Sequence, residues 1–170
     1  MSIRILTTGG TFDKHYDPIT GTLGFAASHL PSLIDQARLA ERPVVEAVLA
    51  LDSLDMNDSH RAAILAACRA SPERQIVVIH GTDTMVETAR LLESARLDAT
   101  IVLTGAMVPA EIDGSDARFN LGFAIASAGL LGPGVWIAMN GIARRGTQVR
   151  KNREAGRFES TQTHPGHTTP

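Results

Sequence analysis

Short apolar segments alternate with longer segments of helical periodicity along this chain. We expect strands at residues 3–8, 75–80, 99–104 and 135–139, each apolar at nearly every position. Strands that are apolar on both faces and separated by helix-length segments are typical of a parallel sheet covered by helices on both sides. The pattern therefore predicts an α/β fold, a parallel-sheet domain of three layers.

Four segments carry apolar residues at helical spacing. They are residues 28–39, 57–70, 82–96 and 118–131. Ser28 is expected to cap the first of these helices, and the last is apolar almost all round, so we expect it to be well buried. Residues 43–51 fit either a strand or a helix, and we favour a strand.

The end of the chain has a different composition. Residues 157–170 are rich in Thr, Pro, Gly and His and show no periodicity. We expect one α/β domain over residues 1–156 and a flexible polar tail over residues 157–170. Residues 149–152 are expected to extend the sheet or join its edge.

Composition narrows the function classes. The formal net charge is −2 and the basic residues form no long stripe, which argues against a nucleic-acid partner. No apolar run approaches the ~20 residues that span a bilayer, so no membrane partner is expected. Cys68 is the single cysteine, we expect it to be a buried apolar side chain, and the N-terminus shows no signal-peptide pattern. A reducing, cytoplasmic location fits these features best.

Three of the expected strands end in unusually polar segments. They are TTGGTF at residues 7–12, HGTDT at residues 80–84 and TGAM at residues 104–107. Sites in doubly wound sheets form in the loops outside the carboxyl ends of the strands. We therefore expect these three segments to form one site.

The residue types at these strand ends suit nucleophilic chemistry. Thr11 follows two glycines, which places a hydroxyl beside backbone N–H groups that can stabilise an oxyanion. Thr82 and Asp83 lie at the expected start of a helix, where N–H groups favour negative charge. Structural alternatives exist: Thr11 can cap a turn, Thr82 and Asp83 can be helix caps, and TTGGT can cradle a phosphate, although it lacks the lysine and spacing of a P-loop. Two hydroxyl-bearing strand ends and an acid favour catalysis.

The pair TTGGTF and HGTDTM resembles the paired threonine signatures of the bacterial-type L-asparaginases. Further segments resemble that family in the same order along the chain. They are LDSLDMND at 51–58, TGAMVP at 104–109, DARFNL at 116–121 and VRKN at 149–152. The resemblance runs from residue 7 to about residue 160.

The resemblance implies a role for each matching residue. Thr11 matches the family's nucleophilic threonine, and Thr82, Asp83 and Lys151 match its second threonine, acid and lysine. Tyr16 lies in the loop that carries a tyrosine and closes over the site, although its alignment is looser.

The same resemblance implies substrate-binding positions. Ser53 matches a ligand of the substrate carboxylate, Asp83 also receives the substrate amino group, and Ala106 matches a contact of the substrate amide. Leu54 stands where many members have a glutamine that binds the amino group, and Phe12 stands where an aliphatic residue is usual. The family is about twice as long, and its smaller C-terminal domain, which supplies groups across a subunit interface, is expected to be missing here.

These observations predict an amidohydrolase that converts L-asparagine and water to L-aspartate and ammonia by threonine nucleophilic catalysis. We expect no cofactor and no metal: His164 and His167 are the only close histidine pair, and they lie in the expected tail. His80 is expected to be a hydrogen-bonding residue at a strand end. The resemblance implies a homo-oligomer, a dimer or tetramer. Two alternatives remain, a non-catalytic amino-acid-binding module and an amidase with another substrate such as glutamine.

Overall fold

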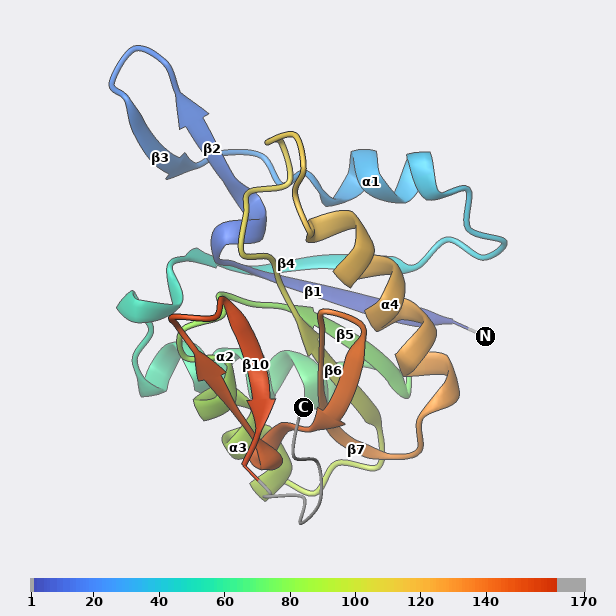
Figure 1. Ribbon diagram of the computed structural model, residues 1–170. Coiled ribbons are helices and arrows are strands. Elements are labelled where there is room, and N and C mark those ends of the chain that lie inside the picture. The colour runs from blue at the N-terminus through green and yellow to red at the C-terminus, as the bar shows by residue number, and fades with distance from the viewer. Residues whose placement is uncertain (1, 162–170) are drawn as a thin grey trace, which may run out of the picture.

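A six-stranded sheet forms the centre of the computed structural model, which describes residues 2–161 (Figure 1). Its strands are β1 (Ile3–Gly9), β4 (Val44–Leu51), β5 (Gln75–Ile79), β6 (Thr100–Thr104), β7 (Gly134–Met139) and β8 (Ile142–Arg145). They lie in the order β4-β1-β5-β6-β7-β8. Neighbours pair in parallel up to β7, and β8 is an antiparallel edge strand. The expected strands are confirmed, including the ambiguous residues 43–51.

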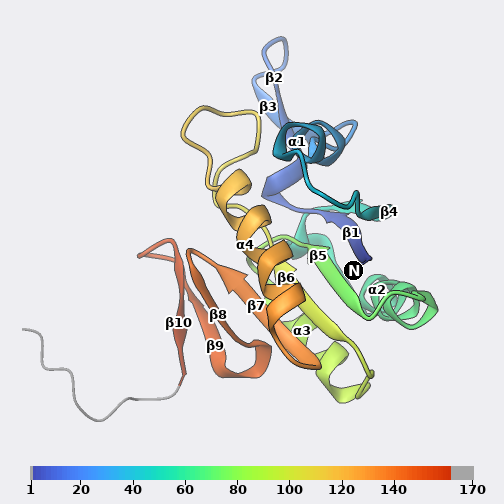
Figure 2. The same ribbon diagram turned by 90° about the vertical axis from the view of Figure 1, so that its right-hand side faces the viewer.

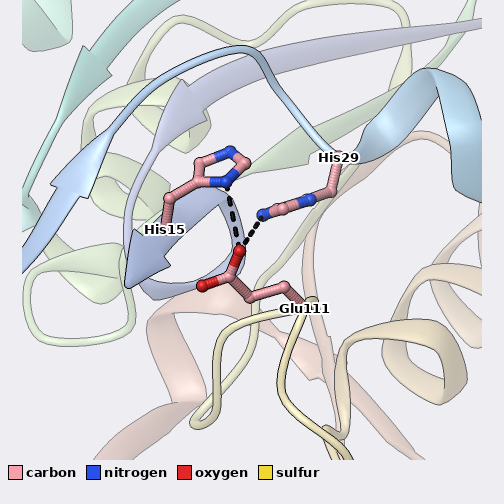
Figure 3. A group of neighbouring side chains, drawn as sticks. All are labelled: His15, His29 and Glu111. Carbon is pink, nitrogen blue, oxygen red and sulfur yellow. Dashed lines mark ion pairs between the residues drawn. The ribbon is translucent and has the colours of Figure 1, made fainter. Parts of the chain in front are cut away.

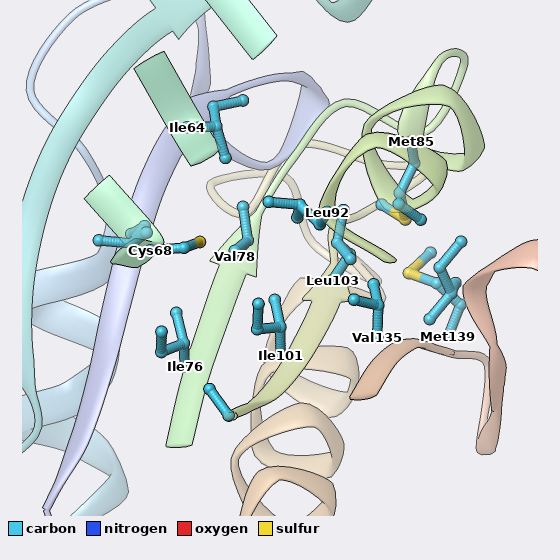
Figure 4. Packing of buried hydrophobic residues seen from close by; sticks show 14 of the residues in the cluster. Ile64, Cys68, Ile76, Val78, Met85, Leu92, Ile101, Leu103, Val135 and Met139 are labelled. Atoms are coloured by element: carbon cyan, nitrogen blue, oxygen red, sulfur yellow. The ribbon is translucent and has the colours of Figure 1, made fainter. Parts of the chain in front are cut away.

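Helices cover both faces of this sheet. The helices α2 (Asp58–Ala70) and α3 (Met85–Ser94) pack on one face, and α1 (Leu30–Ala37) and α4 (Ala117–Leu130) pack on the other. Successive residues of β5 alternate between the two cores: Val78 joins the first, shown in Figure 4, and Val77 joins the second. Side chains of a strand point alternately to opposite faces, so both must be apolar in a sheet covered twice. The three-layer α/β fold is confirmed.

One α4 expectation needs correction, because the helix is not buried all round. Its buried face is made largely of small side chains, among them Ala117, Ala124 and Ala128. Small residues let a helix pack close to the sheet, so the larger apolar residues fall on the outer face. Phe119 is 62% exposed and Leu130 is 85% exposed. The molecule therefore carries apolar surface along α4.

Two antiparallel hairpins flank the main sheet. The first, β2 (Lys14–Asp17) with β3 (Thr22–Phe25), was not anticipated from the sequence and projects away from the domain in both views (Figures 1 and 2). The second pairs β9 (Val149–Asn152) with β10 (Arg157–Ser160). Short 3-10 turns lie at Thr11–Asp13, Ser53–Asp55 and Gly146–Gln148.

The second hairpin corrects two expectations about the end of the chain. Residues 149–152 do not join the main sheet; they pair with β10 in a separate two-stranded sheet. The start of the tail at residue 157 is also wrong, because Phe158 lies opposite Lys151 and packs against the first core. A strand of four residues is too short to show a clear period. Residues 162–170, with the rest of the expected tail, lie outside the described residues.

No helix within residues 2–161 has both the length and the apolar character needed to cross a membrane.

Candidate active site

Backbone contacts join the ends of β1, β4 and β5. The N–H of Gly10 donates to the Leu51 carbonyl oxygen at 2.8 Å, and the Thr8 hydroxyl donates to the Ile79 carbonyl oxygen at 2.8 Å. Gly10 lies so close to Gly81 that a methyl group on Gly10 would come within 2.4 Å of the Gly81 Cα. The segments that begin at Thr11, Ser53 and Thr82 therefore start from one edge of the sheet.

Lys151 reaches this edge from the β9–β10 hairpin. Its Nζ donates to Thr82 Oγ1 at 2.7 Å and to Asp83 Oδ1 at 3.0 Å. Arg153 forms a second ion pair with the same Asp83 oxygen at 3.2 Å. The Lys151 side chain is only 16% exposed, which limits the screening of its ion pair by water. The structure thus brings together the threonine, acid and lysine that the resemblance grouped.

Thr82 and Asp83 do not cap the helix that follows them. The helix α3 begins at Met85, three residues later than the sequence pattern predicted, and its N-cap is Thr84. The Thr84 hydroxyl instead donates to the Ser53 carbonyl oxygen at 2.8 Å, and the Thr82 hydroxyl is also directed at Met107 Sδ, 3.8 Å away. The helix-cap alternative for Thr82 and Asp83 is therefore excluded.

Thr11 lies directly after Gly10 at the start of a 3-10 turn. Gly10 has φ 74° and ψ −176°, a conformation that glycine adopts and other residues avoid. The Thr11 hydroxyl makes no hydrogen bond to any group in residues 2–161, so it does not cap the turn. Its neighbour Phe12 is fully buried in the second core, which fixes the backbone beneath it. The arrangement presents a partly exposed hydroxyl from an anchored turn.

The expected substrate-binding residues lie around the same edge in different states. Ser53 is buried, and its Oγ has no hydrogen-bond partner within residues 2–161. A methyl group on Gly81 would lie 2.6 Å from this Oγ, so Ser53 packs directly against the start of the HGTDT segment. Ala106 is buried, whereas the Leu54 side chain is exposed.

Tyr16 is the one expected catalytic residue that no contact joins to the others. It lies in β2 of the projecting hairpin and is 54% exposed. Its backbone N–H donates to the Glu111 carboxylate, and within residues 2–161 no hydrogen bond joins its side chain to Thr11, Thr82 or Lys151. The hairpin must move if Tyr16 is to act at this edge.

Sequence analysis missed an acid beside these groups. The Asp52 carboxylate accepts a hydrogen bond from Lys14 Nζ at 2.5 Å. Burial raises the pKa of Asp52, but the hydrogen bonds from Lys14 and the Leu54 N–H, with the charges of Lys14 and Lys151, outweigh burial and hold the pKa below its usual value. Asp52 is therefore an anion near Lys151. Its place directly after β4 was the available signal.

Two further residues position the TGAM loop. The Asp116 carboxylate accepts hydrogen bonds from the N–H groups of Met107, at 2.9 Å, and Val108, at 3.1 Å. The buried Asn120 side chain donates to the Gly105 carbonyl oxygen at 3.0 Å and to Asp116 at 2.8 Å. The segment DARFNL thus holds the loop, a role that no local pattern indicated for either residue.

His80 and Cys68, both also considered from the sequence, belong to the core. His80 Nδ1 donates to the Gly81 carbonyl oxygen at 2.8 Å, and the Thr88 hydroxyl lies 2.8 Å from Nε2. Burial lowers the pKa of His80 to about 4, so the ring is neutral near pH 7. Burial raises the pKa of the Cys68 thiol to about 12, in keeping with its expected place as a buried apolar side chain.

Comparison with known proteins agrees with this geometry. The family profile described as "Asparaginase, N-terminal" matches residues 2–168. L-asparaginase 2 of Escherichia coli is 31% identical over 160 residues, which are 88% of this chain and 46% of that protein. A glutamyl-tRNA(Gln) amidotransferase subunit of Methanopyrus kandleri is 33% identical over 189 residues, covering 96% of this chain and 40% of that protein. This chain spans about half the length of such relatives, or less.

A solved structure shows the same fold. The thermostable L-asparaginase from Thermococcus kodakarensis superposes with a TM-score of 0.84 at 28% identity, over 94% of this chain and 51% of that one. The family profile covers nearly the whole sequence, and the fold and the order of the polar strand ends agree with it. The chain therefore belongs to the asparaginase family and corresponds to its N-terminal domain.

Proposed function

We propose that this protein is an amidohydrolase that converts L-asparagine and water to L-aspartate and ammonia. The observation that carries the proposal is the contact of Lys151 Nζ with both Thr82 Oγ1, at 2.7 Å, and Asp83 Oδ1, at 3.0 Å. A lysine held against a threonine hydroxyl can accept a proton from it, directly or through water. The surface position expected of an ordinary lysine would not bring it to two strand-end residues.

The proposed reaction has two halves. Thr11 Oγ attacks the side-chain amide carbon, its proton is taken up by a base, and the C–N bond breaks as the nitrogen leaves as ammonia. Water then attacks the ester formed on Thr11, giving L-aspartate and restoring the hydroxyl. Thr82 and Lys151 take up and return protons, and backbone N–H groups near Gly10 stabilise the oxyanion.

Substrate recognition follows from the charged ends of asparagine. We propose that Asp83 receives the amino group, that Ser53 binds the carboxylate, and that the Ala106 segment contacts the amide. The unpartnered Ser53 Oγ supports this role, because a buried hydroxyl without a partner is destabilising unless a ligand completes it. Leu54 offers no hydrogen bond to the amino group, so weak binding and little activity on glutamine are expected.

The direct test is release of ammonia from L-asparagine and, separately, from L-glutamine. Thr11→Ala and Thr82→Ala are each expected to lower turnover by at least ~10³-fold while the circular dichroism spectrum stays unchanged. Thr22→Ala, an exposed hydroxyl in the projecting hairpin, is the matched control and should keep full activity. Binding of asparagine by a well-folded protein without any ammonia release would favour an amino-acid-binding module instead.

A second candidate is transfer of an amide nitrogen rather than hydrolysis to free ammonia. The similarity to a glutamyl-tRNA(Gln) amidotransferase over 96% of this chain favours it. In that case free ammonia would be released from asparagine slowly by the purified chain, and a partner protein would raise the rate. Rapid release by the chain alone would exclude this candidate.

Assembly and location complete the proposal. We propose a homo-oligomer, a dimer or tetramer, in which the exposed apolar residues of α4 are covered; Phe119 stacks on Phe123 with ring centroids 6.3 Å apart. Light scattering of the purified chain and of Phe119→Glu would test this. A cytoplasmic location is supported by the single cysteine, and one similar structure, from Campylobacter jejuni, is described as "Probable Cytoplasmic L-asparaginase". Cell fractionation would test it.

A further inference from the structure

Three side chains of metal-binding type meet beside the projecting hairpin (Figure 3). His15 comes from β2, His29 directly precedes α1, and Glu111 lies in the loop between β6 and α4. Their ligand atoms all lie within 4.8 Å of one another, and they form the one such group of three or more within residues 2–161. None of the three belongs to the proposed catalytic set.

The hydrogen bonds of His15 fix the state of its ring. Nε2 lies 2.7 Å from the Ala27 carbonyl oxygen, which only accepts, so Nε2 must carry a proton. In a neutral ring, Nδ1 then presents a lone pair, yet it faces Glu111 Oε2 at 3.1 Å, which is also an acceptor. Two lone pairs at this distance repel unless a proton or a cation lies between them.

His29 distinguishes these two possibilities. Its Nε2 is buried, points toward the same Glu111 oxygen at 3.8 Å, and has no hydrogen-bond partner within residues 2–161. A proton on His15 would satisfy Glu111 but would leave this nitrogen without a partner. A metal ion between the three groups would satisfy all of them at once, because each offers one lone pair to the same point.

We propose that His15 Nδ1, His29 Nε2 and Glu111 Oε2 bind a divalent transition-metal ion of the Zn²⁺ type. Two imidazoles and one carboxylate form a ligand set that suits zinc and its first-row neighbours rather than Mg²⁺ or Ca²⁺. In a tetrahedral site with bonds of about 2.0–2.1 Å, ligand atoms lie about 3.3 Å apart. The observed separations from Glu111 Oε2, 3.1 Å and 3.8 Å, need only small side-chain adjustments to match.

The surroundings also fit a metal site. Metal-binding imidazoles usually donate their second N–H to a carbonyl or carboxylate, and His15 donates its own to Ala27. The other Glu111 oxygen accepts the backbone N–H of Tyr16, which orients the carboxylate. Three protein ligands leave a fourth position for water.

Such an ion would link three segments that are distant in the sequence. It would fasten β2 to the start of α1 and to the loop between β6 and α4. Because His15 precedes Tyr16 in the same strand, the ion would also restrict the hairpin that carries Tyr16. The site is therefore a clamp on the hairpin, and its existence does not depend on the proposed hydrolysis.

The test is zinc binding by untagged, chelator-treated protein, measured by calorimetry and by elemental analysis after dialysis. We expect one Zn²⁺ per chain, no binding of Mg²⁺ at equal concentration, and a Tm that rises with added zinc. His29→Ala and Glu111→Gln should each weaken binding at least ~100-fold and abolish the Tm shift. Co²⁺ should give the visible absorption of a tetrahedral site in the parent protein alone.

A matched control separates this site from the histidine pair near the end of the chain. The double variant His164→Gln with His167→Gln should keep both the zinc stoichiometry and the Tm shift. The proposal is overturned if the parent protein binds no zinc, if Glu111→Gln binds as tightly as the parent, or if only the double variant loses binding. Circular dichroism of each variant without metal checks that the fold is intact.

Discussion

Lys151 and Tyr16 are both expected to act at the same sheet edge, yet the molecule presents them in opposite ways. Lys151 is 16% exposed and its amine is held between Thr82 and Asp83. Tyr16 is 54% exposed and extends from a hairpin that projects beyond the domain (Figure 2). One side of the candidate site is assembled, and the other is open.

The difference follows from what supports each residue. Lys151 lies opposite Phe158, which packs on the first core, so its strand is fixed by apolar burial. The hairpin of Tyr16 is tied down mainly by polar contacts to Glu111 and Ala27, which are weaker and more easily exchanged with water. Groups that stabilise charge work best when they are held in advance, whereas closing segments must move. The assembled side is therefore suited to electrostatics and proton transfer, and the open side to closure over a substrate.

The largest expected effect comes from breaking the assembled side at Lys151. Lys151→Met removes the amine at similar volume, and Lys151→Arg keeps the charge but cannot act as a base. Both should lower kcat for ammonia release by at least ~10³-fold, because each removes the proton acceptor. Arg153→Met, which removes the exposed partner of the same Asp83, is the control and should retain most activity. Turnover preserved in Lys151→Arg would mean that position 151 supplies only charge, and Tyr16 would be the next candidate base.

Two glycines allow the same comparison in terms of stability. A methyl group on Gly10 would lie 2.4 Å from the backbone of Gly81, whereas one on Gly21, in the hairpin turn, would meet nothing within 4 Å. Both glycines have positive φ, 74° and 69°, so both alanine variants carry backbone strain. We expect Gly10→Ala to lower the free energy of unfolding by at least ~3 kcal/mol and Gly21→Ala by only ~1 kcal/mol. Urea unfolding measures both, and equal losses would mean that the contact between β1 and β5 is not rigid.

The same contrast explains what the sequence could predict. The buried strands were visible because a doubly covered sheet needs apolar residues on both faces, as Val77 and Val78 illustrate. Their spatial order and the antiparallel β8 were not, because pairing depends on contacts between distant segments. The hairpin over residues 14–25 was missed because it is solvated and has no apolar period.

For the site, the residues themselves showed only that hydroxyls and an acid follow three strands that end at one edge. The meeting of Lys151 with Thr82 came from the family resemblance, since no local pattern links positions 69 apart. The outer face of α4 was misjudged because composition alone cannot show which apolar side chains face the sheet. Asp116 and Asn120 carried no visible signal beyond their place in DARFNL.

On the open side, we expect a smaller effect from Tyr16→Phe. The tyrosine hydroxyl has no partner in residues 2–161 to lose, so the variant should fold with unchanged Tm. If the hairpin closes during turnover, kcat should fall by about 10–100-fold while the Lys151 contacts stay intact. Steady-state kinetics with asparagine measures this. A loss as large as that of Lys151→Met would show that the hairpin side is as essential as the assembled side, whereas full activity would remove Tyr16 from the mechanism.

Leu54 offers a way to improve the site rather than break it. Its side chain is exposed and follows β4 next to Ser53, where a glutamine amide would be able to accept a hydrogen bond from the substrate amino group. Leu54→Gln should lower KM for asparagine by about tenfold, because a hydrogen bond to a charged group contributes about 1.5–3 kcal/mol, part of which is offset by ordering the side chain. Leu23→Gln, which places the same amide in the projecting hairpin, is the control and should leave KM unchanged. No change in KM for Leu54→Gln would contradict the placement of the amino group beside this turn.

The smallest expected effect concerns acid stability and tests the rigid edge beneath the assembled side. Burial lowers the pKa of His80 from 6.5 to about 4, so the unfolded chain takes up a proton more readily than the folded one. Between these values the free energy of unfolding should rise with pH, so the stability that a neutral His80 allows is complete above pH 6.5 and is lost as the pH falls toward 4. The slope from this one group is at most about 1.4 kcal/mol per pH unit. Carboxylates with lowered pKa values, such as Asp52 and Glu73, act in the same direction at lower pH, so the slope must be compared with that of His80→Gln. Because Gln cannot titrate but keeps a donor for Gly81 and an acceptor for Thr88, this variant should be less stable at pH 7 and should show a shallower slope between pH 6.5 and 4. Urea unfolding at a series of pH values measures both slopes, and parallel curves for the two proteins would mean that His80 does not remain neutral and enclosed at the end of β5.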